Sequence, residues 1–132
     1  MACILIVDDD DQVRETLRQM LERSGYETVE ATDGKAAIRL HCAHPADLII
    51  MDLIMPEKEG IETIVELRRN FPDVKIIAIS GGSRRIEPDD FLHLAKRLGA
   101  QHAFKKPFNL EELLEAIHQL LNMEKNNSSN LI

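Results

Sequence analysis

Four aspartates in succession, Asp8 to Asp11, follow directly on an apolar run, Cys3 to Val7. A buried strand that ends in adjacent acids places several negative charges at the edge of a protein core. Crowded carboxylates repel one another unless a cation neutralises them, and Mg²⁺ is a suitable partner because it prefers oxygen ligands. The alternative is that Asp10 and Asp11 cap a helix and that all four side chains are solvated.

Three further reactive side chains adjoin apolar runs. Asp52 ends the run 47–52, Ser80 ends the run 74–80, and Lys106 follows the short run 102–105. Phosphoryl transfer to a carboxylate needs an in-line nucleophile and neutralisation of the phosphoryl oxygens. Asp52 would be the nucleophile and form an acyl phosphate, while Lys106 and Ser80 would bind phosphoryl oxygens. Taken singly, each of these residues is more simply explained as a turn or surface residue.

The metal ligands follow from the same interpretation. Asp8 and Asp9 would hold Mg²⁺ directly or through water, and Asp52 would complete the site. Gly81, after Ser80, has no side chain to obstruct a bulky phosphoryl group. The sequence therefore predicts three acids, a hydroxyl and an ammonium group in one site.

The elements that must position these groups alternate regularly along the chain. Apolar runs typical of buried strands occupy residues 4–7, 47–52 and 74–80, and a short strand is expected over 102–105. Residues 27–31 are expected to form a weaker, partly polar strand nearer an edge of the sheet. Between and after them, apolar residues recur at helical spacing around 13–21, 34–43, 61–67, 91–98 and 110–121. Strict alternation predicts a parallel sheet covered by helices on both faces. Ligands bind at the carboxyl ends of the strands in such sheets, so the reactive groups are expected to meet at one edge.

Composition limits the class of protein. The chain has 132 residues, enough for one domain, which we expect over 1–123 with a polar, frayed tail over 124–132. The formal net charge of −7 argues against non-specific binding to nucleic acid or anionic membrane. The apolar runs are too short for a membrane span, and the N-terminus does not resemble a signal peptide. The two cysteines, Cys3 and Cys42, suit a reducing compartment, so a cytoplasmic location is expected.

These residues and their order resemble the receiver domains of the two-component response-regulator family, in their stand-alone, single-domain form. The resemblance spans about residues 2 to 122. It is carried by four segments, namely Ile4–Asp10, Asp52–Pro56 with Gly60 after it, Ile79–Ser80 and Lys106–Phe108.

The resemblance implies a fold and a set of site residues. The fold would be α/β, a flavodoxin-like doubly wound five-stranded parallel sheet of order 2-1-3-4-5 with five helices. Asp52 would be the phosphoacceptor, Asp8 and Asp9 the acidic pair for Mg²⁺, and the backbone carbonyl of Ile54 a further metal ligand. Ser80 stands where the family has its switch hydroxyl.

Lys106 corresponds to the family's phosphate-sensing lysine, with a cis peptide before Pro107. The function implied is phosphorelay signalling, in which a sensor histidine kinase or histidine phosphotransfer protein supplies the phosphoryl group. Output would come from contact with an unknown protein target or from passing the phosphoryl group on. The protein is expected to be a monomer or weak dimer and no enzyme beyond Mg²⁺-dependent self-phosphorylation and slow autodephosphorylation. A segment of a longer regulator would have the same sequence.

The chain departs from the family's pattern at two places. Ala103 occupies the position where the family has Tyr or Phe, which puts the family's aromatic movement in question, and Phe104 is expected to pack in the core. The stretch 80–91 is longer than usual, and Arg84 or Arg85 in it would suit a partner's carboxylate or an anion, although a solvated loop is the simpler expectation.

Three alternatives remain open. A receiver fold that acts as a phosphorylation-independent scaffold is one. A small phosphatase with an Asp nucleophile is another, which the residues favour less because such enzymes carry their nucleophile after the first strand and an acid two residues later, where this chain has Ile54. A metal site around His41, Cys42 and His44 is disfavoured by their spacing. The remaining histidines, His93, His102 and His118, are expected at the surface.

Overall fold

The computed structural model describes residues 2–53, 59–80 and 88–130. Within them five strands form one parallel sheet of order β2-β1-β3-β4-β5, so the predicted fold class and strand order are confirmed. The strands are β1 (Cys3–Val7), β2 (Glu27–Ala31), β3 (Leu48–Asp52), β4 (Ile76–Ser80) and β5 (His102–Lys105). The helices are α1 (Asp11–Arg23), α2 (Gly34–Ala43), α3 (Glu59–Asn70), α4 (Pro88–Arg97) and α5 (Leu110–Asn130).

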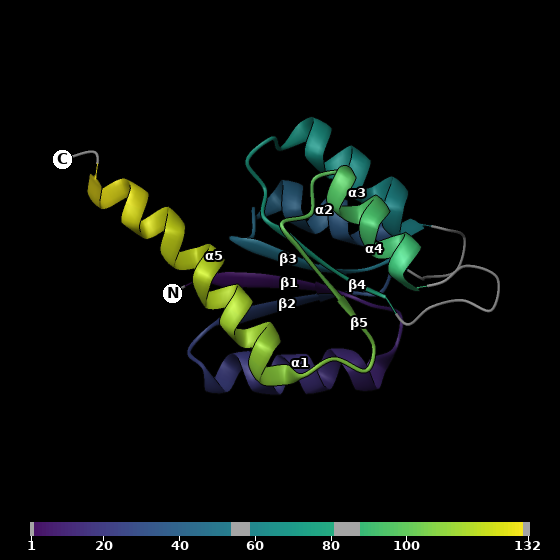
Figure 1. Ribbon diagram of the computed structural model, residues 1–132, viewed down its shortest axis with the longest axis horizontal. Helices are drawn as coiled ribbons and strands as arrows, with labels where there is room; N and C mark the ends of the chain where they lie inside the picture. The colour runs from purple at the N-terminus through teal and green to yellow at the C-terminus, as the bar shows by residue number, and fades with distance from the viewer. Residues whose placement is uncertain (1, 54–58, 81–87, 131–132) are drawn as a thin grey trace.

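Helices cover both faces of the sheet, with α1 and α5 on one face and α2, α3 and α4 on the other (Figure 1). Alternate side chains of a strand point to opposite faces. Leu5 and Val7 therefore pack beneath α2, α3 and α4, whereas Ile4 and Ile6 pack beneath α1 and α5. β3 and β4 are buried at every position, as expected of central strands.

The edge strand β2 is the polar strand that the sequence indicates. Glu27, Val29 and Glu30 are exposed and only Ala31 is buried. Charged side chains on an edge strand discourage pairing with another chain.

Side-chain caps set the starts of three helices. The Asp10 carboxylate accepts hydrogen bonds from the backbone N–H groups of the first turn of α1, and Asp33 does the same for α2. Asn109 Oδ1 accepts from the N–H groups of Glu111 and Glu112 at 2.8 and 3.1 Å. Each cap satisfies backbone donors that have no partner within the helix.

Several boundaries differ from the sequence-based expectation, and two of them have a clear physical reason. The polar tail from Glu124 was expected to fray, but α5 continues to Asn130; the segment contains neither Gly nor Pro to stop a helix that has already formed. β4 begins at Ile76, two residues later than predicted. The side-chain amide of Gln101 bonds to Ile76 N and Val74 O, at 2.7 and 3.4 Å, in place of a strand partner.

Figure 1 shows the C-terminal part of α5 running beyond the sheet. Nearer its start, α5 is anchored to the α1–β2 corner by a hydrogen bond between the Tyr26 hydroxyl and His118 Nδ1. Among the described helices, none combines the length and the apolar character that crossing a bilayer requires.

Candidate functional site

The carboxyl ends of four strands carry the residues that the sequence singles out. Asp8 directly follows β1, Asp52 is the last residue of β3, Ser80 is the last residue of β4 and Lys106 directly follows β5. Because the strands are parallel, these ends meet at one edge of the sheet. Asp8, Asp52 and Ser80 are at most 1% exposed. The structure thus brings the predicted residues to one rim, partly enclosed by the fold.

Three carboxylates form a compact group at this rim. One oxygen of each of Asp8, Asp9 and Asp52 lies within 4.8 Å of the others. Asp8 and Asp52 are buried, whereas Asp9 is exposed. Mg²⁺ binds oxygen ligands and usually keeps several waters, so a group of three acids that is open to solvent on one side fits a divalent cation of this kind.

Asp8 is fixed through several of its atoms. Its Oδ1 accepts a hydrogen bond from Asp10 N at 2.9 Å, and its Oδ2 accepts one from Lys106 Nζ at 3.0 Å. Its backbone N–H donates to Ala31 O at 3.2 Å on the neighbouring strand. The carboxylate of Asp8 is therefore held in a defined direction at the rim.

Lys106 is the cation of the site. Its ammonium lies 3.0 Å from Asp8 Oδ2 and 3.5 Å from Asp52 Oδ2. Burial alone would lower the pKa of Lys106, but the charge of Asp52, and then the hydrogen bond and charge of Asp8, outweigh burial and raise that pKa above its ordinary value. The peptide bond to Pro107 is cis, as the family resemblance predicts.

Ser80 is buried beside this group. Its backbone carbonyl accepts a hydrogen bond from Lys106 N at 2.7 Å, so the end of β4 and the residue after β5 are joined directly. The hydroxyl and the ammonium thereby come from adjacent strands at the same edge of the sheet.

Asp10 and Asp11 do not belong to the carboxylate group. Asp10 is the N-cap of α1, with Oδ1 2.9 Å from Gln12 N and 3.3 Å from Val13 N. Asp11 lies in the first turn of the same helix and pairs with Arg14. Of the two residues that were expected to cap a helix, Asp10 does so, whereas Asp11 lies inside the helix; Asp8 and Asp9 belong to the carboxylate group instead.

Two residues near the site have structural roles that the sequence does not predict. The guanidinium of Arg14 donates to the backbone oxygen of Asp8 at 2.8 Å; the only hint is the i,i+3 spacing from Asp11, which is typical of a surface ion pair. Gly60 belongs to the family motif, but the sequence gives no physical reason for a glycine at this position. A Cβ on Gly60 would lie 2.6 Å from Asp52 O and from Leu53 Cα, so α3 approaches the end of β3 too closely for any side chain.

Several predicted contributors lie outside the described residues. They are the backbone carbonyl of Ile54, which was expected to bind the metal, and Gly81, Arg84 and Arg85 in the stretch after β4. Within the described part of β5, Ala103 packs toward α2, α3 and α4, and Phe104 packs against the cluster beneath α1 and α5. Phe104 is partly buried and packs against the core, so its predicted core position is confirmed in part.

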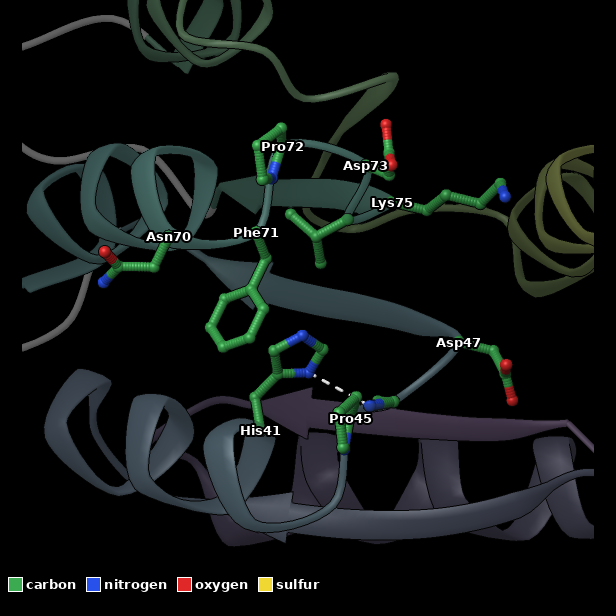
Figure 2. A pocket seen from close by; sticks show the side chains of 10 residues that line it. His41, Pro45, Asp47, Asn70, Phe71, Pro72, Asp73 and Lys75 are labelled. Carbon is green, nitrogen blue, oxygen red and sulfur yellow. Dashed lines mark hydrogen bonds between the residues drawn. The ribbon is translucent and has the colours of Figure 1, made fainter.

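His41 lies away from this rim and has a structural role. It is buried, its Nδ1 accepts a hydrogen bond from Ala46 N at 3.0 Å, and its ring meets Phe71 edge-on with centroids 4.5 Å apart. Figure 2 shows this arrangement in a cavity of about 340 Å³ near the start of β3. The group of three acids above is the only cluster of metal-ligand side chains found among the described residues, so a metal site at His41, Cys42 and His44 finds no support there.

The expectation that the other histidines lie at the surface is only partly correct. His93 is exposed, but His118 is half-buried by its bond to Tyr26 and His102 is half-buried 6.5 Å from the Phe104 ring. The contact between Tyr26 and His118 joins elements far apart in the sequence, which local periodicity does not register.

Comparison with known proteins agrees with this geometry. The sequence profile of the response regulator receiver domain matches residues 4–118. The response regulator MprA of Mycolicibacterium vanbaalenii is 36% identical over 121 residues, which cover 89% of this chain and 49% of MprA. The transcriptional regulatory protein CpxR of Escherichia coli K12 is 37% identical over 118 residues, covering 89% of this chain and 48% of CpxR. The chain spans about half the length of these relatives.

Solved structures give the same result for the whole fold. The receiver domain protein (CheY-like) from Methanospirillum hungatei JF-1 superposes with a TM-score of 0.86 at 27% identity, covering 96% of this chain and 98% of that one. The receiver domain of the Francisella response regulator 1452 gives 0.83 at 26% identity, covering 94% and 99%. With the profile match extending over most of the sequence, this chain belongs to the response regulators of two-component systems and is a receiver domain.

Proposed function

We propose that Asp52 accepts a phosphoryl group from a phosphohistidine in a Mg²⁺-dependent step. The observation that carries this proposal is the meeting of Asp8, Asp9 and Asp52 within 4.8 Å, with the ammonium of Lys106 beside two of them. Asp52 is the acid of this group that ends a central strand, so its position is the most rigidly supported.

The transfer needs little covalent work from the protein. An oxygen of Asp52 attacks phosphorus in line with the P–N bond of the donor phosphohistidine. That bond breaks, its electron pair returns to the imidazole nitrogen, and an aspartyl phosphate forms. Lys106 is 3.5 Å from Asp52 Oδ2, close enough to bind an oxygen of the transferred group as a flexible point charge. Ser80, at the end of the adjacent strand, would donate its hydroxyl to another oxygen of that group.

The acids of the rim would hold the cation. Asp8 and Asp9 would be its ligands together with Asp52. When bound, Mg²⁺ neutralises the negative charge that develops on the phosphoryl oxygens. The role of the chain is to hold the three carboxylates in place against their mutual repulsion, which the contacts of Asp8 with Asp10 N and Lys106 Nζ accomplish.

A groove beside the site suits the approach of a protein donor. It has a volume of about 650 Å³ and runs between α1 and the segment that leads from β5 to α5. Apolar side chains of Val13, Leu17 and Phe108 line it, and Asp10 and Lys106 connect it to the acidic rim. The expected donor is a sensor histidine kinase or a histidine phosphotransfer protein, because either carries the phosphohistidine that this chemistry needs.

The wider function follows from this reaction. Phosphorylation draws Ser80 and Lys106 toward a new anion and so shifts an equilibrium between two conformations, which a downstream protein reads by contact or uses by accepting the phosphoryl group. Catalysis by the chain is limited to its own phosphorylation and slow dephosphorylation. The reaction takes place in the cytoplasm, a location consistent with two free cysteines.

Mass spectrometry after incubation with acetyl phosphate or phosphoramidate and Mg²⁺ tests the proposal. A single phosphoryl adduct should form on Asp52 and be absent in Asp52→Asn. The matched control is Asp73→Asn, an exposed acid near the opposite edge of the sheet, which should be labelled like the wild type.

Three results would count against the proposal. Persistent labelling of Asp52→Asn would refute the assignment of the acceptor. No adduct on the wild type would favour a scaffold that acts without phosphorylation. Steady turnover of a small phosphate ester would favour a phosphatase.

A further inference from the structure

Arg14 joins the acidic rim to the edge of the sheet. Its Nη1 donates to the backbone oxygen of Asp8 at 2.8 Å. Its Nε lies 3.3 Å from Glu30 Oε1 on β2, and its Nη2 pairs with Asp11 Oδ1 in the first turn of α1. One side chain thus contacts the loop after β1, the edge strand and the helix that follows.

This arrangement depends on the planar guanidinium. Three of its nitrogens each meet an oxygen from a different segment, and the side chain is only 12% exposed. Lysine has one ammonium group on a flexible stem and cannot satisfy three separated acceptors in a fixed plane. Because Arg14 contacts the backbone of Asp8, it fixes the point at which the chain turns from β1 into α1. The positions of the Asp8 and Asp9 side chains depend on that turn.

We propose that Arg14 is a positioning residue for the divalent cation, holding the backbone of Asp8 against β2 so that the carboxylates of Asp8 and Asp9 face Asp52. This role rests on the Mg²⁺ site of the proposed function. Groups that orient metal ligands without touching the metal commonly change metal affinity by tenfold or more when they are removed.

The positive charge of Arg14 and its proposed positioning role have opposite effects on Mg²⁺ affinity. This difference makes the role testable. A positive charge near a cation site weakens cation binding, so Arg14→Met would tighten Mg²⁺ binding if only charge mattered. Arg14→Lys would leave the affinity unchanged on the same basis. If Arg14 positions Asp8, both substitutions weaken binding.

The experiment is a titration of Mg²⁺ into the ¹⁵N-labelled, unphosphorylated chain, followed by NMR at about 0.1 M salt, where surface charge effects are partly screened. We expect Arg14→Met and Arg14→Lys to raise the dissociation constant about tenfold. The same spectra report whether each variant is folded, and Arg14→Lys decides the question if Arg14→Met does not fold.

Arg18→Met is the matched control. Arg18 lies one helical turn further along α1 and forms ion pairs with Glu15, Glu22 and Glu30 at 3.6, 3.5 and 4.0 Å. Arg18 and Arg14 both pair with Glu30. The substitution Arg18→Met therefore removes a positive charge close to Arg14 but keeps the contact between Arg14 and Asp8. Its Mg²⁺ affinity should equal that of the wild type or exceed it slightly.

The possible results separate the two proposals. If the wild type shows no Mg²⁺-dependent shifts at the rim, the proposed metal site is wrong and the role of Arg14 falls with it. If the wild type binds Mg²⁺ and Arg14→Lys binds it equally well, the metal site stands and the positioning role is wrong. Equal weakening in Arg18→Met would also overturn the role, because the weakening would then not depend on the contact between Arg14 and Asp8.

Discussion

Lys106 occupies the position of a counter-ion in the unphosphorylated site. Asp8 and Asp52 are almost fully buried, and leaving a buried carboxylate without a partner is costly. We predict that Lys106→Ala lowers the free energy of unfolding by about 1–3 kcal/mol when no divalent cation is present. The pKa of Lys106 is raised in the folded protein, so this stabilisation is complete below about pH 10.5 and is lost only at higher pH.

Urea unfolding at pH 7 in the presence of a chelator measures this loss. Lys96→Ala is the control, because Lys96 is exposed on α4 and should change the free energy of unfolding by about 0.5 kcal/mol or less. Added Mg²⁺ should recover part of the stability of Lys106→Ala, since a cation that binds only the folded state stabilises it. Equal effects of the two substitutions would show that the acids do not need Lys106.

Individual site residues were predictable where a simple rule fixes their place. Asp8, Asp52 and Lys106 each adjoin an apolar strand, and the carboxyl ends of parallel strands must meet. Arg14 was not predictable, because its partner is a backbone oxygen whose direction depends on how the chain turns after β1. The sequence also left open which acids of the run cap the helix, and only the hydrogen bonds of Asp10 separate the two roles.

The approach of α3 to β3 depends on a single glycine. Alanine normally stabilises a helix relative to glycine by about 1 kcal/mol. At Gly60 the added Cβ would meet backbone atoms of Asp52 and Leu53 at 2.6–2.8 Å, and backbone cannot move aside as a flexible side chain can. We predict that Gly60→Ala destabilises the protein by about 1–3 kcal/mol and slows labelling of Asp52, because either α3 or the end of β3 must shift.

Chemical denaturation and the rate of phosphoryl labelling test the two effects together. Gly25→Ala is an informative control, because Gly25 has a φ of 91° but no atom within 4 Å of an added Cβ. It should cost stability through backbone strain of about 1 kcal/mol and leave labelling unchanged. A stabilised or normally labelled Gly60→Ala would contradict the close contact.

The sequence predicted the order and type of the helices and strands better than the residues at which they begin and end. Alternating apolar runs and helical spacing identify each element because burial imposes those periods. The end of α5 depends on the absence of a stop signal, and the start of β4 depends on Gln101, a residue 25 positions away from Ile76. Contacts over such distances lie beyond any local pattern.

At the scale of the whole molecule, one buried titratable group, His41, lies at the end of the sheet opposite Asp8, Asp9 and Asp52. His41 Nδ1 accepts a hydrogen bond from Ala46 N, so this nitrogen is unprotonated in the folded protein. Burial lowers the pKa of His41 below its ordinary value of 6.5. In Figure 2 the carboxylates of Asp47 and Asp73 point away from the ring, and burial is the only cause of the lowered pKa among the described residues.

The unfolded chain therefore binds a proton at His41 more readily than the folded chain does. His41 contributes stability that is fully present above about pH 6.5 and is lost as pH falls through the lower pKa of the folded state, with a slope of at most about 1.4 kcal/mol per pH unit. We predict that His41→Gln, whose side chain does not titrate, flattens the dependence of unfolding free energy on pH between 7.5 and about 5.5.

Urea unfolding across this range should be compared with that of His93→Gln, which removes an exposed histidine of α4. His93→Gln is the control for the loss of one histidine side chain at an exposed position. Carboxylates contribute equally to all three proteins, so only the difference in slope reports His41. An unchanged slope in His41→Gln would show that His41 binds a proton equally well in the folded and unfolded chains, and it would contradict the prediction.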